Sequence, residues 1–340
     1  MSEYKSYILS ENEIDVWDEF VDKSPYGTIF HKYEWLKIAE EHAGMKFLPV
    51  AVNKGNTVVS LLPLFIKNKY GFRLLLSPPN SCAIPHLGPV FNIPATNRYV
   101  YEKTYINIID AIIEFVEVKL GFDYIRIIHT PQIFDIRPYL WEKYNVKPNF
   151  TYILNLKNKN EEIYKKFYTS IRNNIKNAKK NRDILISHCM EHSYDTLSLV
   201  KERYSEQNRS FKVSENYIKN LMNSSFAQNI ESVSLIHNGN LIAGTIDLMD
   251  RNHICSWLGT VNRKMNITGA GELLLWETLK EYRNKGYTTY DLVGANTRHL
   301  CDYKAKFGPD LVQYFVVYKA SVKGKLALKL MNFYKKGSYD

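Results

Sequence analysis

The stretch FLPVAVNKGNTVVSLLPLFI, residues 47–66, indicates the fold class, because it reads as two strands around a tight turn. Apolar side chains fill 47–52 and 58–66, and Asn53-Lys54-Gly55-Asn56 between them has the composition of a hairpin turn. A second stretch, SVSLIHNGNLIAGTIDL at 232–248, has the same order of strand, Asn-Gly turn and strand. We therefore expect one antiparallel hairpin in each half of the chain.

The segments after the two hairpins correspond as well. Residues 105–119 have apolar side chains at helical spacing and lead through a glycine into an apolar strand at 124–128. In the second half, a helical pattern over 272–285 leads through a glycine into a strand at 289–293. The glycines of the two hairpins are 184 residues apart and those that end the two helices are 165 apart, so the order is kept. The sequence therefore predicts a duplicated domain.

Antiparallel hairpins that are each followed by a helix and a strand are typical of mixed sheets, in an α/β fold of the α+β kind. We expect a first domain over 1–148 and a second over 149–320, joined near Pro148, because proline disfavours helix at the residue before it. A basic tail over 321–340 carries leucines among its lysines. We expect the tail to dock on the body, and contact with a membrane surface is the alternative.

Composition excludes several classes of protein. Hydrophobic residues make up 45% of the 340, and no apolar run approaches the roughly 18 residues of a membrane span. The first residues lack the basic flank and apolar block of a secretion signal, and the four cysteines contain no Cys-x-x-Cys pair, so we expect a cytoplasmic protein. His188 and His192 do not match the zinc protease pattern, so we expect no metal.

Positive charge is concentrated in residues 157–182, where nine Lys or Arg and two Glu give a net charge of +7. Arg172, Lys176, Lys179 and Lys180 recur at helical spacing, while Ile171, Ile175 and Ala178 fall on another face. This pattern is that of a solvated helix face, or of a surface that binds the phosphates of a nucleotide-linked substrate, coenzyme A or RNA.

A glycine-containing loop lies between a predicted strand at 254–258 and the helix that begins near 272. Small residues let a pyrophosphate approach the backbone, and the first N–H groups of a helix have no partner of their own. The candidate cofactor-binding residues are Arg263, Gly269, Ala270 and Gly271. A loop that only begins the helix is the alternative.

The segment CDYKAKFGP, residues 301–309, lies between two apolar strands and contains two lysines. Tyr303 and Phe307 are spaced as on one helical turn, which predicts buried aromatic rings with Lys304 on another face, directed toward the strands. A lysine held there is a fixed positive charge for the oxyanion that develops when an amine attacks a carbonyl. The alternative is a surface lysine that pairs with Asp302 or Asp310.

Several of these features together resemble the FemABX peptidyltransferases and the related GNAT-type acetyltransferases. The resemblance covers roughly residues 15–320 and rests on the duplicated halves, SPYGT at 24–28 with YEW at 33–35, IRNNIKNA at 171–178, and the element Tyr303-Lys304-x-x-Phe307-Gly308. It implies two tandem GNAT-like acyltransferase domains with mixed sheets and a binding channel. The chain departs from the GNAT pattern at Asn266, where such enzymes usually have Arg or Gln.

The resemblance also implies roles for residues of this chain. In the aminoacyl-transferring members, the lysine that corresponds to Lys304 is implicated in stabilising the reacting carbonyl, and we expect Lys304 to be catalytic. The expected substrate-binding residues are Lys37, Arg172, Lys176, Lys212, Tyr217, Trp257 and Tyr303.

The function that we expect is a cytoplasmic N-acyltransferase. It would move an acyl group from acyl-CoA, such as acetyl-CoA, to an amine of a phosphate-containing cell-envelope or sugar-nucleotide precursor. The alternative is a FemX-type peptidyltransferase, which would take an amino acid from aminoacyl-tRNA and add it to a peptidoglycan-like precursor. A third hypothesis is a non-catalytic protein that binds a nucleic acid or a membrane surface through the basic helix; we expect no DNA partner.

Overall fold

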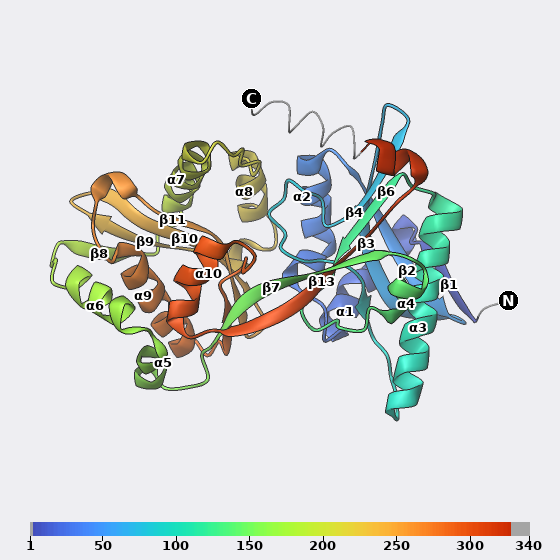
Figure 1. Ribbon diagram of the computed structural model, residues 1–340, viewed down its shortest axis with the longest axis horizontal. Coiled ribbons are helices and arrows are strands. Elements are labelled where there is room, and N and C mark those ends of the chain that lie inside the picture. Colours follow the sequence, from blue (N-terminus) through green and yellow to red (C-terminus); the bar gives the residue numbers. More distant parts are fainter. Residues whose placement is uncertain (1–2, 328–340) are drawn as a thin grey trace. The chain divides into compact units, whose positions relative to one another are not determined.

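The computed structural model describes residues 3–327, and it divides into two compact units (Figure 1). The first unit consists of residues 3–149 and 314–327, and the second consists of residues 150–313. The chain therefore leaves the first unit once and returns to it. Among residues 3–327, no helix has the length and hydropathy needed to cross a membrane.

The first unit contains one mixed sheet in the order β1-β2-β3-β4-β6-β13, with β5 paired to β3. Its strands are β1 (Tyr4–Ile8), β2 (Lys46–Lys54), β3 (Thr57–Lys69), β4 (Phe72–Ser77), β5 (Val90–Phe91), β6 (Tyr124–Ile128) and, from residue 314 onward, β13 (Asp310–Ala320). Its helices are α1 (Asp15–Lys23), α2 (Tyr33–Ala43), α3 (Arg98–Glu114), which continues as a π-helix over Phe115–Leu120, and α4 (Arg137–Trp141). The pair β4 and β6 is parallel, and the other neighbours are antiparallel.

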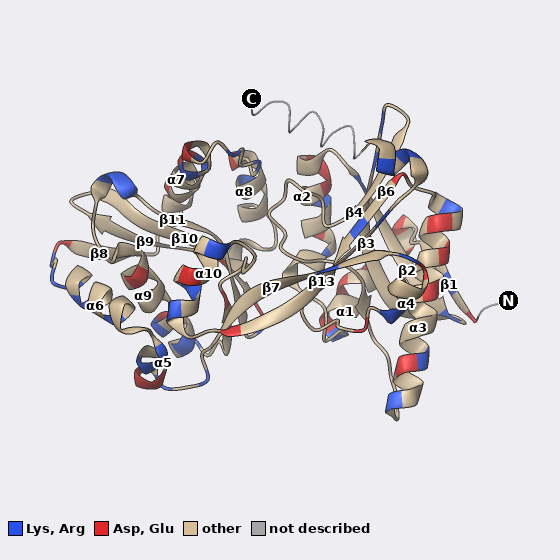
Figure 2. Cartoon of the chain, in the orientation of Figure 1, with Lys and Arg blue, Asp and Glu red and all other residues tan. Residues whose placement is uncertain are grey.

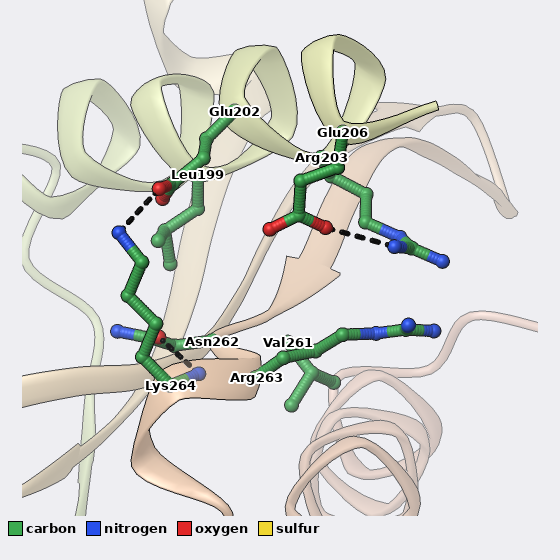
Figure 3. Close-up of a pocket in the computed structure, with 8 residues that line it drawn as sticks. All are labelled: Leu199, Glu202, Arg203, Glu206, Val261, Asn262, Arg263 and Lys264. Atoms are coloured by element: carbon green, nitrogen blue, oxygen red, sulfur yellow. Dashed lines mark hydrogen bonds and ion pairs between the residues drawn. The ribbon is translucent and has the colours of Figure 1, made fainter. Parts of the chain in front are cut away.

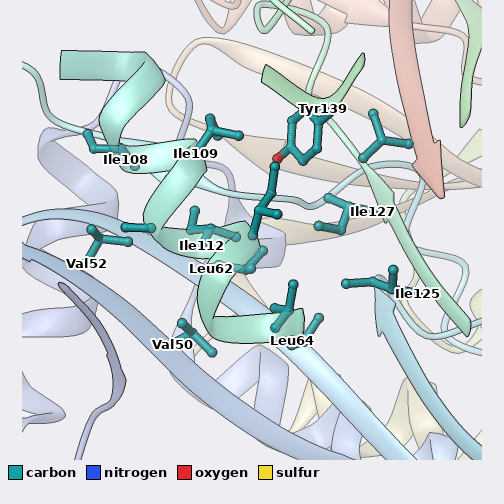
Figure 4. Close-up of a cluster of buried hydrophobic side chains, with 14 of the residues drawn as sticks. Val50, Val52, Leu62, Leu64, Ile108, Ile109, Ile112, Ile125, Ile127 and Tyr139 are labelled. Carbon is teal, nitrogen blue, oxygen red and sulfur yellow. The ribbon is translucent and has the colours of Figure 1, made fainter. Parts of the chain in front are cut away.

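Alternating side chains of the hairpin β2–β3 face two helical layers. Leu48 and Leu64 are paired across the strands and belong to the cluster covered by α3, while Phe47 is opposite Phe65 and packs against Trp17 of α1 with ring centroids 5.6 Å apart. Figure 4 shows this core, in which isoleucines of α3 lie over side chains of β2, β3 and β6. The period-two pattern of 47–66 therefore gives a sheet that is buried on both faces.

The second unit contains a sheet in the order β7-β12-β11-β10-β9-β8. Its strands are β7 (Asn145–Asn155) from residue 150 onward, β8 (Ile184–Ser187), β9 (Ile230–His237), β10 (Asn240–Asp250), β11 (His253–Val261) and β12 (Thr289–Asp291). Its helices are α5 (Asn160–Lys166), α6 (Thr169–Ala178), α7 (His192–Glu206), α8 (Glu215–Met222), α9 (Ala270–Asn284) and α10 (Arg298–Lys304), which a short 3-10 turn at Ala305–Phe307 extends. Helices α7 and α8 lie on one side of the sheet, and α5, α6 and α9 lie on the other (Figure 1).

The predicted hairpins and mixed sheets are present. Lys54 pairs with Thr57 and His237 pairs with Asn240 at the two turns, and the predicted strand 124–128 is β6. The predicted helix 105–119 begins earlier, at Arg98, because the Asn97 side chain caps it and its first turn is exposed and carries no apolar period.

The predicted tail falls largely on residues 328–340, which lie outside the described residues. Within 321–327, Lys323 donates a hydrogen bond to the carbonyl of Gly71 and lies 3.6 Å from the Asp123 carboxylate. These contacts tie the start of the tail to the first unit.

Candidate functional site

The parallel strands β11 and β12 separate soon after they begin to pair. Their register covers three residue pairs and ends at Cys255 and Asp291, whereas β11 continues to Val261 beside β10. Beyond Cys255, no strand of the described part of the chain pairs with the β12 side of β11. A strand edge with free N–H and C=O groups can accept an extended partner.

The glycine loop lies between β11 and α9, as predicted, but packing inside the protein already accounts for its glycines. Gly269 has a φ of +85°, and a Cβ there would lie 2.3 Å from the carbonyl oxygen of Asn174 in α6. A Cβ on Gly271 would lie 2.8 Å from Val261 and 3.4 Å from the Tyr303 hydroxyl. The loop therefore brings α6, β11 and α10 together at the start of α9, where the first N–H groups of the helix have no intrahelical partners.

A carboxylate also lies at this helix start. Glu272, in the first turn of α9, accepts a hydrogen bond of 3.0 Å from the side-chain amide of Asn174. A negative charge there is stabilised by the helix dipole, and it would repel a phosphate at the same position.

Lys304 lies at the last residue of α10, and its ammonium group points into the protein. It donates hydrogen bonds to the carbonyl oxygens of Leu292 (2.9 Å), Val293 and Gly294 (3.4 Å), at the end of β12. The prediction that Lys304 faces the strands agrees with this geometry, and its hydrogen bonds within residues 3–327 go to these carbonyls and not to Asp302 or Asp310. Its role in a reaction stays a prediction.

Burial and three neighbouring groups set the pKa of Lys304. Desolvation lowers it, which is the largest effect, and Asp291, Cys301 and Cys255 raise it by favouring the charged form. Burial raises the pKa of the Cys255 thiol well above its usual value. The ammonium is thus a partly buried cation next to one buried carboxylate.

Tyr303 differs from its predicted environment. The ring of Phe307 is buried, but Tyr303 is 37% exposed and packs edge-on against Phe307 at 5.3 Å. Desolvation, with a contribution from Glu272, raises the pKa of the Tyr303 phenol. The short helix ends at Gly308, so it buries one aromatic ring and leaves the other at the surface beside Gly271.

The predicted basic helix is α6, and its apolar residues are buried against α9 (Figure 2 shows the basic residues in blue). The Arg172 guanidinium donates to the carbonyl oxygens of Lys165 (2.9 Å) and Phe167 (2.8 Å), at the end of α5. Lys179 pairs with Glu277 of α9 at 2.8 Å. Lys176 is exposed and has no ion pair within residues 3–327, so among the candidate binding residues of α6 it is the one that keeps a free charge.

Arg263 lies in a short 3-10 turn after β11 and lines a small hollow against α7 (Figure 3). In this hollow Lys264 is directed at Glu202, and Arg203 pairs with Glu206 at 2.9 Å. The exposed Arg263 side chain extends below the Arg203 pair, so a ligand there would meet two guanidinium groups.

The remaining predicted substrate residues belong to other elements than the glycine loop. Tyr217 of α8 and Trp257 of β11 are both buried and pack with ring centroids 6.2 Å apart, so they are core residues here. Lys212 is exposed in the loop before α8. Lys37 belongs to α2 of the first unit and pairs with Glu40.

Three side chains have the types and spacing of metal ligands. Ligand atoms of His188, Glu231 and Glu281 all lie within 4.8 Å of one another. The ammonium of Lys285 lies 2.9 Å from Glu231 and 2.7 Å from Glu281, and each nitrogen of the His188 ring faces a carboxylate at 3.0 Å. Because these cationic and ring groups already satisfy both carboxylates, the cluster supports no metal assignment.

Sequence reasoning missed two buried carboxylates of the second unit. Asp247 accepts from Thr245 (2.7 Å) and from the Tyr290 hydroxyl (3.1 Å), and desolvation raises its pKa to about 7. Asp291 is 1% exposed and accepts from Thr151 and from the backbone N–H of Val293. The signal that could have found them is an Asp within an otherwise apolar strand.

The comparisons with known proteins agree with this architecture. Residues 165–305 match the acetyltransferase (GNAT) domain family. No match was found among the curated proteins.

Solved structures resemble the chain over nearly its whole length at low identity. The crystal structure of FemX matches with a TM-score of 0.66 and 11% identity over 92% of this chain and 96% of that one. The C-terminal domain of a putative lysylphosphatidylglycerol synthetase from Agrobacterium fabrum matches with a TM-score of 0.53 and 12% identity, over 92% and 95%. A tandem GNAT protein from the clavulanic acid biosynthesis pathway matches with a TM-score of 0.52 and 11% identity, over 93% and 98%. The predicted fold of tandem GNAT-like domains is confirmed.

Proposed function

We propose that this chain acts as an N-acyltransferase, with the substrates and the mechanism given below. Residues 165–305 match the acetyltransferase (GNAT) domain family, and the architecture is that of the FemABX and GNAT-type superfamily. The donor that we propose is acyl-CoA, and the acceptor is an amine. The observation that carries this proposal is the junction where β11 and β12 separate, because an open strand edge, a helix start and the Lys304 ammonium lie around it.

The junction has two features that suit a coenzyme A thioester. The free edge of β11 from Ser256 to Val261 can hydrogen-bond an extended chain of amides, as an added strand would. The first turn of α9 directs backbone N–H groups toward phosphates at its start, although the N–H of Ala270 already donates to the Ile267 carbonyl at 3.3 Å. Arg263, Gly269, Ala270 and Gly271 are the residues that we assign to the donor phosphates.

The reaction needs no covalent enzyme intermediate. The amine nitrogen attacks the thioester carbonyl and forms the C–N bond, the C–S bond then breaks, and the nitrogen loses a proton as the thiolate gains one. We assign to Lys304 the stabilisation of the oxyanion, an electrostatic role that requires no proton transfer. The Gly294 carbonyl, at 3.4 Å, is its longest contact and is therefore the one that an oxyanion would displace.

The acceptor that we propose is a phosphate-containing precursor of the cell envelope or a sugar nucleotide. Lys176, Lys212 and Tyr303 are exposed and can meet such a ligand. Acyl-CoA is present in the cytoplasm, and we place the reaction there.

A second candidate donor is aminoacyl-tRNA. Two observations favour it: the Glu272 carboxylate lies where a pyrophosphate would bind, and residues 157–182 carry a net charge of +7. With this donor the amine attacks an ester, and the role assigned to Lys304 is unchanged.

The donor can be tested by ligand-dependent thermal unfolding. Micromolar acetyl-CoA should raise the midpoint, because a ligand that binds only the folded state stabilises it. A charged tRNA should do so instead if it is the donor, with an effect that declines steeply as salt rises. If neither donor shifts the midpoint, the proposed enzyme function is wrong, and the binding hypothesis that relies on the basic helix takes its place.

A further inference from the structure

The backbone between β12 and α10 contains a strained bulge. Val293 has a φ of 52° and Gly294 has a φ of 64°. On either side, Leu292 donates to the Tyr152 carbonyl at 2.8 Å and Ala295 donates to the Phe150 carbonyl at 3.0 Å, as in a strand pair. A left-handed conformation is a genuine outlier for a β-branched residue and costs about 1–3 kcal/mol, so other contacts must hold Val293 there.

Two charged side chains hold the bulge from opposite directions. The carboxylate of Asp291 accepts the N–H of Val293 at 2.7 Å and also the hydroxyl of Thr151. The ammonium of Lys304 donates hydrogen bonds to the three carbonyl oxygens of Leu292, Val293 and Gly294. The N–H side of the bulge is therefore fixed by the carboxylate and the C=O side by the ammonium.

The charged and titratable groups around this ammonium come from three elements. Asp291 lies at the end of β12, Cys255 lies on β11 and Cys301 lies on α10. Asp291 is the one carboxylate among them, and it is almost fully buried. It is therefore the group whose charge the ammonium senses most directly in a poorly screened environment.

We propose that Asp291 is a positioning residue for Lys304: it fixes the Val293–Gly294 bulge so that three carbonyls face the ammonium and hold it where β11 and β12 separate. This inference rests on the proposed role of Lys304 in acyl transfer. Asp291 itself does not touch the reacting atoms. Its effect is to set the place and the charge of the lysine before the substrates bind.

The test is Asp291→Asn in the full chain, because asparagine keeps an oxygen acceptor for Val293 and Thr151 but removes the charge. The pKa of Lys304, followed by NMR titration of its labelled ε-carbon, should fall by about one unit, since an adjacent opposite charge shifts a pKa by roughly that much or more. The alkaline limb of the pH dependence of kcat should move down by the same amount, while KM for the donor stays unchanged.

Asp247→Asn is the matched control. Asp247 is as buried as Asp291 in the same unit, but its hydrogen bonds go to Thr245 and Tyr290 and not to the bulge. This variant should leave the Lys304 titration and the alkaline limb in place. An equal shift in both variants would overturn the inference, because burial of any carboxylate would then explain it.

A second variant keeps the inference testable if Asp291→Asn does not fold. Val293→Gly removes the strain, because glycine adopts a positive φ at little cost, and it also opens other backbone conformations to the bulge. We expect kcat to fall by about tenfold while the melting temperature stays equal or rises. An unchanged kcat would overturn the positioning role.

The proposed function and this inference can fail separately. If Lys304→Ala retains full turnover, the catalytic role of Lys304 is wrong, and the NMR titration still decides whether Asp291 sets its charge. If Lys304→Ala loses turnover but Asp291→Asn shifts neither the titration nor the alkaline limb, only the positioning inference is wrong.

Discussion

The two units use the same strand junction differently. In the first unit, the parallel pair β4 and β6 ends at Ser77 and Ile127, and the loop that follows β4 returns to the junction. Leu87 donates to the Ile128 carbonyl at 2.9 Å and bridges to His129, so the chain itself extends the sheet there. In the second unit, β11 is the counterpart of β4, and its edge beyond Cys255 is left without a strand partner within the described residues. The Lys304 ammonium binds the carbonyls that follow β12, the counterpart of β6.

This difference shows that the same order of strands and helices leaves an open junction in the second unit and a loop-paired one in the first. A junction completed by its own loop contributes to stability, whereas a junction left open can take a substrate. The buried polar groups differ accordingly. The first unit encloses the His129 ring, neither nitrogen of which has a hydrogen-bond partner among residues 3–327, and the second unit encloses carboxylates.

The largest expected effect is a loss of stability of the first unit at acidic pH. Burial lowers the pKa of His129 to about 3, below its ordinary value of 6.5. Because the folded state resists protonation, the stability that the neutral ring contributes is complete above pH 6.5 and is lost as the pH falls toward 3, on the order of 5 kcal/mol in total. Hydrogen exchange of the β6 amides should accelerate over this range, and His129→Leu should remove that dependence. The same acceleration in His129→Leu would contradict the assignment.

The stability of the second unit should depend on pH in the opposite direction. Desolvation raises the pKa of Asp247 from 3.8 to about 7, so the protonated form is favoured in the folded state. The stability that this group contributes is complete below pH 3.8 and is lost as the pH rises toward 7, on the order of 4 kcal/mol. Exchange of the β10 amides should accelerate over that range in the wild type and not in Asp247→Asn. An Asp250→Asn control should behave like the wild type.

The open junction is tested by Lys304→Ala. Turnover, measured as thiol release from acetyl-CoA in the presence of an amine acceptor, should fall by about 10²-fold, as when one oxyanion donor is lost. The melting temperature should also fall, because three carbonyls lose their donor. Lys306→Ala, two residues away on the exposed surface, is the control. Equal turnover of the two variants would remove the distinction between the junctions.

The smallest expected effect is a difference in the free energy of unfolding between two α6 variants, one at a charge that binds the backbone and one at an exposed charge. Arg172→Ala should lower the free energy of unfolding by about 1 kcal/mol, because it removes the donor for the end of α5. Lys176→Ala should change it by less than about 0.5 kcal/mol, because the side chain is exposed. Urea denaturation measures both. Equal losses would mean that the basic helix is stabilised by its charges as a set.

Sequence periodicity predicted the regular elements because burial on a sheet face imposes it. The strand 124–128 and both hairpin turns were identified from alternation and turn chemistry alone. The end of β12 was not identified, because Val293 has a high strand propensity. Its left-handed conformation is held by contacts with Asp291 and Lys304, and the local sequence carries no signal of these contacts.

For the candidate site, the sequence predicted where residues lie in the fold better than it predicted which groups they contact. Lys304 was expected near the strand ends and lies there, but the three carbonyls that it binds depend on the bulge. Arg172 was expected to bind a ligand, and its guanidinium instead binds backbone carbonyls that no spacing pattern reveals. Gly269 was expected to admit a phosphate, and its lack of a Cβ is required by the approach of α6.

The return of the chain to the first unit has a practical consequence for dissecting the protein. The strand segment after Tyr314 pairs with β6, so the first unit is completed by residues that follow the whole second unit in the chain. A fragment that stops near residue 149 would expose the outer edge of β6 and is expected to aggregate. Cleavage in an exposed loop of the second unit would leave both segments of the first unit in one fold. On the ribosome, the sheet of the first unit cannot be completed until the second unit and the β13 residues that follow it have been synthesised.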